Sequence, residues 1–98
     1  MNPMTSDEIM SKLHEYERIY YKFHNSVPEW MFEELKYKHG KDFSQLKEMF
    51  EYSLRVVGSD KSRLDANVSL RWNISNHIIK YKPLFDIMEK LAEQKLEN

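Results

Sequence analysis

The sequence predicts an all-α protein, a compact bundle of four to five helices that forms a single helical domain over residues 1–98. Three observations support this fold class. Apolar residues recur at helical spacing through most of the chain. Helix-start signals precede the first three periodic segments, and a glycine follows the second and the third. With 98 residues, 41% of them apolar and 32% charged, the chain has the length and composition of one globular domain.

The first helix is expected over residues 6–24. Thr5 and Glu8 have the spacing of a capping box, in which each side chain binds a free backbone N–H at the helix start. Steps of four and three then place five large apolar residues on one stripe: Ile9, Leu13, Tyr16, Tyr20 and Phe23. Ile19 lies among charged residues on the other side, so we expect it to be exposed. A stripe this regular is also compatible with self-association, which makes a homodimer one expected state.

The second helix is expected over about residues 28–39. Ser26 and Glu29 have the spacing of another capping box, and Gly40 suits the left-handed position after a helix end.

The third helix is expected to open at Asp42 with Gln45 and to stop at Gly58. Its inner stripe consists of Phe43, Leu46, Phe50, Leu54 and Val57.

Residues 59–82 allow two interpretations. Apolar and polar residues alternate strictly from Leu64 to Ser75, which is typical of a half-buried strand and would give an α+β fold with a hairpin at about 52–57/64–74. Few of these residues are β-branched, and Asn and Asp are poor strand formers. We therefore favour a central helix that contacts neighbours on both flanks through two apolar stripes. One stripe is Leu64, Val68, Trp72 and Ile79, and the other is Leu70, Ile74, Ile78 and Tyr81.

Pro83 is expected to kink or break this helix because proline lacks the backbone donor and disfavours a helical residue before it. A last helix is expected over about residues 84–96, where the apolar face is wide.

Composition excludes several classes of function. The formal net charge is −1, so no overall charge draws the chain to nucleic acid or to an anionic membrane. Cys is absent, which excludes disulfides and thiolate chemistry. The sequence contains no apolar run of about 18 residues and begins with nothing that resembles a signal peptide. We expect a cytoplasmic protein without membrane contact.

The sequence gives no sign of a metal site or a cofactor. No His lies three residues after a Glu, no two His are four residues apart, and no glycine-rich phosphate loop is present.

Arg71 and His77 are separated by five residues and resemble the Arg-x4-6-His motif of HEPN-domain ribonucleases, over seven residues and with Trp72 where that family often has a polar residue. The resemblance implies an all-α, metal-independent ribonuclease in which both side chains act on the scissile phosphate, usually across a dimer. We keep this as an alternative and do not expect an enzyme.

A second alternative is a helical nucleic-acid-binding protein. Two small basic spots, each beside a tyrosine, could contact phosphate and stack a base. They consist of Lys36, Lys38 and Lys41 at the end of the second helix and of Lys80 and Lys82 next to Pro83. Because these residues also suit helix ends and ordinary solubility, we do not favour this reading.

The sequence favours recognition of another protein over these alternatives. Met31, Phe32 and Leu35 share one face of the second helix, whereas Trp30 and Tyr37 lie nearly opposite, beside Glu33 and Glu34. If the first face packs inward, the second presents aromatic residues of the types enriched at binding hot spots. We therefore expect a small non-catalytic module that binds and modulates a partner protein through Trp30 and Tyr37, with Glu33 and Glu34 setting the electrostatic preference.

The composition also suggests an origin. Gly and Pro are scarce, at 2 and 3, whereas Phe, Tyr and Met number 5, 6 and 6. This bias indicates AT-rich coding DNA, and our hypothesis is an accessory protein of a phage or mobile element that acts on a host protein.

Overall fold

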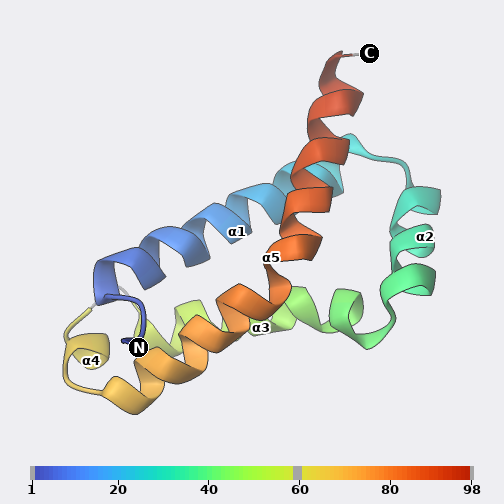
Figure 1. Ribbon diagram of the computed structural model, residues 1–98. Helices are drawn as coiled ribbons and strands as arrows, with labels where there is room; N and C mark the ends of the chain where they lie inside the picture. The colour runs from blue at the N-terminus through green and yellow to red at the C-terminus, as the bar shows by residue number, and fades with distance from the viewer. Residues whose placement is uncertain (1, 59–60, 98) are drawn as a thin grey trace.

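The computed structural model describes residues 2–58 and 61–97 and confirms the all-α class (Figure 1). Within these residues the helices are α1 (Ser6–Ser26), α2 (Glu29–His39), α3 (Lys41–Val57), α4 (Ser62–Asp65) and α5 (Val68–Glu97). No strand occurs among them, so the hairpin at 52–57/64–74 is wrong, although residues 59–60 of its turn lie outside the described residues. The buried apolar side chains of all five helices form one core cluster, and α1 and α5 have the most extensive mutual contact.

The start of α1 confirms the capping box. The backbone N–H of Glu8 donates to the Thr5 hydroxyl at 3.2 Å, and the Thr5 N–H donates to the Glu8 carboxylate at 3.3 Å. Ile19 does not follow the expectation, because it is only 9% exposed and belongs to the core. The C-terminal half of α5 covers this side of α1, where Ala92 lies next to Ile19 around the same hollow.

The starts of α2 and α3 differ from the predicted caps. Ser26 is the last residue of α1, because the Val27 N–H continues the hydrogen-bond ladder to the Phe23 carbonyl, and α2 follows Pro28 without a side-chain cap. α3 begins at Lys41, directly after Gly40, so Asp42 lies inside its first turn.

Gly40 and Gly58 end α2 and α3 as predicted. Their φ values of 57° and 60° are in the region that favours glycine, and each backbone N–H donates to the carbonyl four residues earlier.

α5 is continuous through Pro83, so the separate helix at 84–96 is wrong, although the kink is confirmed: Figure 1 shows α5 changing direction about midway. Pro83 removes the donor for the Ile79 carbonyl, but both residues are exposed, so water can bind that carbonyl. Inside the bundle, the Tyr16 hydroxyl donates to the neighbouring Ile78 carbonyl at 2.7 Å. Two residues after Pro83, the Phe85 ring stacks on the Tyr16 ring, with centroids 3.9 Å apart.

Only one of the two predicted stripes of the central helix is buried. Ile74, Ile78 and Tyr81 belong to the core, and Leu70 is half-buried. Of the other stripe only Leu64, which lies in α4, is buried; Val68, Trp72 and Ile79 are exposed. The expectation that this helix is covered on both flanks is therefore wrong for the described residues, because α1 and α3 pack on one side of α5 alone.

The buried hydroxyl of Tyr16 predicts a pH dependence of stability. Burial, followed by the nearby carboxylates of Asp86 and Glu15, raises its pKa from 10.0 to about 12. The folded state then holds this proton more tightly than the unfolded state. The stability that this pKa difference contributes is therefore complete below pH 10 and is lost as the pH rises through about 12. Denaturant unfolding across this range should show a fall in stability for the wild type that is weaker in Tyr16→Phe.

At neutral pH the same variant should lose about 1 kcal/mol, because the hydrogen bond to Ile78 is gone. Parallel pH profiles of the two proteins above pH 10 would contradict this role of Tyr16.

Candidate functional site

α2 lies at one side of the molecule and packs mainly against α3, to which it is joined at a corner (Figure 1). Its inner face is held by Leu35, which is 6% exposed, and by Phe32. The Phe32 ring is wedged between Phe23 of α1 and Phe43 of α3, with centroid distances of 4.9 and 5.9 Å. α2 is thus fixed through one face only.

The opposite face of α2 carries Trp30 and Tyr37. Trp30 is 61% exposed and Tyr37 is 92% exposed. Because seven residues are almost two turns of an α-helix, the two rings lie on the same side of α2. We call this surface, with Glu33 and Glu34 between the rings, the α2 outer face.

The two glutamates of the α2 outer face are paired within the helix. Glu33 lies 3.7 Å from the Lys36 ammonium and Glu34 lies 3.2 Å from that of Lys38, all with exposed side chains. Each negative charge therefore has a positive neighbour, and the acidic character expected of this surface is largely offset.

The lysines of the nucleic-acid alternative are mostly paired with carboxylates. In addition to Lys36 and Lys38, Lys80 lies 3.7 Å from Asp42 of α3, and Lys82 lies 2.8 Å from Asp86. The hydrogen bond and the charge of Asp86 raise the pKa of Lys82. The Lys80–Asp42 contact brings the two predicted basic spots near each other beside Lys41, but acidic side chains are interspersed with them.

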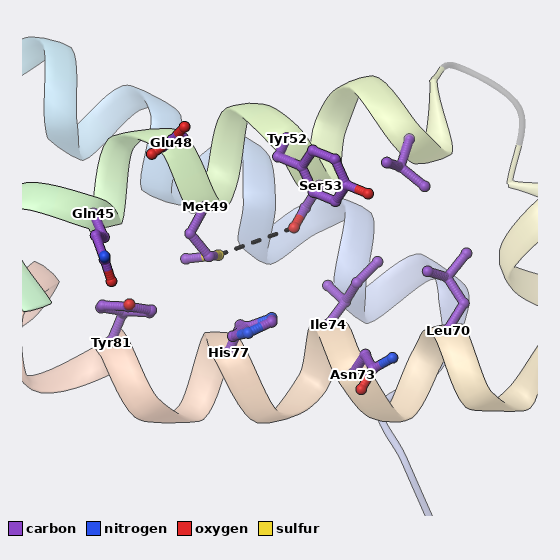
Figure 2. Close-up of a pocket in the computed structure, with 11 residues that line it drawn as sticks. Gln45, Glu48, Met49, Tyr52, Ser53, Leu70, Asn73, Ile74, His77 and Tyr81 are labelled. Carbon is purple, nitrogen blue, oxygen red and sulfur yellow. Dashed lines mark hydrogen bonds between the residues drawn. The ribbon is translucent and has the colours of Figure 1, made fainter.

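Arg71 and His77 lie around different hollows of the chain. The Arg71 guanidinium donates to the carbonyls of Leu64 and Asp65 and so ties the end of α4 to the start of α5. His77 lines the space between α3 and α5 (Figure 2). Within one chain, the two residues of the ribonuclease-like motif are therefore not brought together.

The hollow that contains His77 is a groove of about 600 Å³ between α3 and α5. Figure 2 shows Met49 of α3 and Ile74 and Leu70 of α5 pointing into it. Gln45, Glu48 and Asn73 supply polar groups to its lining. This groove is not among the sites that the sequence predicts. The steps of four and three through Gln45, Met49, Tyr52 and Val56, beside the inner stripe of α3, are the signal that could have indicated it.

Among the described residues, no three His, Asp or Glu side chains come together in a way that could hold a metal ion. In the same part of the chain, no helix combines the length and the apolar character needed to cross a bilayer. Comparisons with known proteins return no matching family model, no matching curated protein and no matching solved structure.

Proposed function

We propose that this protein is a non-catalytic binding module that recognises a cytoplasmic partner protein through the α2 outer face. The observation that carries the proposal is the exposure of Trp30 and Tyr37, at 61% and 92%, on one side of a helix whose other side is packed. Tryptophan and tyrosine offer a large contact area and lose few rotamers when they bind, so they are enriched at hot spots.

The attachment of α2 supports this role. Phe32 and Leu35 fix its inner face, and Gly40 sets the corner with α3. The two exposed rings are thus presented on a regular helix, so little backbone ordering is needed on binding.

The proposal includes modulation of a host protein by a phage or mobile-element product. The scarcity of Gly and Pro and the abundance of Phe, Tyr and Met support this part, because they point to AT-rich coding DNA. The base composition and the neighbours of the gene test it directly.

The experiment for the binding function uses the full chain as bait in a host lysate. The wild type and Tyr52→Ala should retain the same protein, whereas the double variant Trp30→Ala/Tyr37→Ala should lose it. Tyr52 is the matched control, since it is a 59% exposed aromatic on α3. Retention of the same protein by the double variant would overturn the proposal. If Tyr52→Ala alone failed to retain the captured protein, binding would be assigned to the groove between α3 and α5.

The glutamates of the α2 outer face are expected to contribute little to this binding. Exposed ion pairs are worth about 0.2–1 kcal/mol each, so Glu33→Gln and Glu34→Gln should each change the affinity for the partner less than about fivefold. Calorimetric titration of the captured partner at low and at moderate salt measures this. A much larger loss that disappears as salt is raised would show that charge, rather than the aromatic rings, dominates the interface.

A further inference from the structure

The groove between α3 and α5, which is separate from the α2 outer face, has the size and the apolar surface of a small-molecule site. Its volume of about 600 Å³ lies within the range of about 300–1,000 Å³ that is typical of ligand pockets. The apolar part of its lining comes from both helices, with Met49 and Val56 from α3 and Leu70 and Ile74 from α5. A ligand in the groove would therefore contact two helices at once (Figure 2).

A buried hydroxyl in this lining has only a weak hydrogen-bond partner. Ser53 is 4% exposed, and among the described residues its hydroxyl makes a single hydrogen bond, to the sulfur of Met49 at 4.0 Å (Figure 2). Because the hydroxyl donates in that bond, both lone pairs of its oxygen remain available to a donor. The amide groups of Gln45 and Asn73, in the same lining, make no hydrogen bond to the described residues. The groove thus offers hydrogen-bond acceptors that the protein itself does not use.

The charge of the lining is that of one carboxylate. Glu48 contributes it, and no Lys or Arg is among the described residues that line the groove. The other acidic side chains of α3 are paired, Asp42 with Lys80 and Glu51 with Lys47, whereas Glu48 has no cationic partner among the described side chains. No lysine or arginine lies three or four residues from Glu48 in the sequence, so α3 cannot supply one. An unpaired carboxylate beside an apolar surface attracts a cation and repels an anion.

Two cations contact aromatic rings of the lining without neutralising Glu48. Lys80 lies 5.3 Å from the centre of the Tyr81 ring, but its ammonium group is already paired with a carboxylate of α3. Arg55 lies 5.8 Å from the centre of the Tyr52 ring, and it is seven residues, or about 10 Å of helix, beyond Glu48. The preference for a cation therefore belongs to the end of the groove at Glu48.

We propose that this groove binds a small amphipathic amine, with the ammonium group beside Glu48 and the apolar body along Met49 and Ile74 toward Leu70. An ammonium group has three donors and no acceptor, which suits a lining whose unused polar groups include the Glu48 carboxylate and the Gln45 carbonyl oxygen one turn away. A carboxylic acid of the same shape would be repelled, and an alcohol would lack the ion pair. The site requires neither the α2 outer face nor its proposed partner protein.

Three compounds that share one carbon skeleton test the choice of ligand. Phenylbutylamine, phenylbutanol and phenylbutyrate are titrated into the isotope-labelled full chain at neutral pH, where the amine is protonated and the acid is ionised. For a ligand of this size we expect the amine to bind with a dissociation constant of about 1 mM and to shift the backbone NMR signals of α3 and α5 around the groove. The alcohol should bind about threefold more weakly, and phenylbutyrate about tenfold more weakly, because it is repelled where the amine is attracted.

Glu48→Gln tests the ion pair separately from the apolar contact. The amine should then bind no better than the alcohol, and the affinity for the alcohol should not change. Glu48 is exposed, so the variant should keep its fold, which circular dichroism checks. Glu93→Gln is the matched control, because it removes an exposed glutamate of α5 that does not line the groove, and it should bind the amine as the wild type does.

Four results would each overturn the proposal. They are the absence of saturable shifts around the groove at about 10 mM amine, shifts centred on another part of the chain, equal affinity for all three compounds, and an unchanged preference for the amine in Glu48→Gln.

Discussion

Phe85→Ala should lower the free energy of unfolding by about 3–5 kcal/mol, the range for removal of a buried aromatic side chain. Phe85 is fully buried at the point where α1, α3 and α5 meet. Its ring stacks on Tyr16 with an interplanar angle of 8° and meets the edge of Phe50 at a centroid distance of 6.1 Å. Alanine at this position therefore leaves a cavity and removes packing contacts among all three helices.

Chemical denaturation measures this loss as a lower midpoint with an unchanged slope. Tyr37→Ala serves as the control and should stay within about 0.5 kcal/mol of the wild type, because Tyr37 is 92% exposed. If the two variants lost similar amounts of stability, the core would not be centred on Phe85.

Trp30→Ala should weaken binding to the partner by about 2 kcal/mol or more, a factor of roughly thirty in the dissociation constant. The reason is the combination of a large aromatic surface with 61% exposure on a helix held in place from its other side. Unfolding of the same variant should match the wild type within about 0.5 kcal/mol, since the indole is not part of the core. Calorimetric titration with the purified partner gives the first quantity and thermal unfolding gives the second.

Loss of stability together with binding would mean that Trp30 supports the fold instead of contacting a partner. Tyr52→Ala is the control for the loss of an exposed ring elsewhere and should leave the affinity unchanged.

The sequence predicted those helix ends that are determined by a few neighbouring residues. The Thr5–Glu8 box and the Gly40 and Gly58 stops were predictable because each involves a few neighbouring residues with one favourable geometry. Ser26 and Glu29 have the same spacing as a capping box, but the ladder of α1 continues through Val27 and overrides it.

The alternation after Leu64 was misleading because it spans two different structures. Its first part covers the end of α4 and the turn before α5, and the rest covers a helix with an exposed apolar stripe. A helix with apolar residues on both flanks has the same pattern whether one flank or both are covered. Only the placement of α1 and α3 decides that point.

In the candidate site, too, some features follow from the local sequence and others only from how the helices pack. The opposite faces of α2 follow from helical periodicity, so the exposure of Trp30 and Tyr37 could be anticipated from the sequence. The pairing of Glu33 and Glu34 with lysines one turn later could also have been found from their spacing. The separation of Arg71 from His77 could not, because it depends on Arg71 binding the carbonyls at the end of α4.

The most direct test of the central claim follows the indole of Trp30 when the partner binds. Trp72→Phe leaves Trp30 as the only tryptophan, because the sequence has two. In the free protein, acrylamide should quench its fluorescence readily, as expected for a side chain that is 61% exposed. Saturation with the partner should shift the emission to shorter wavelength and protect the ring from quenching. Unchanged emission and quenching in the saturated complex would contradict the assignment of the α2 outer face as the binding surface.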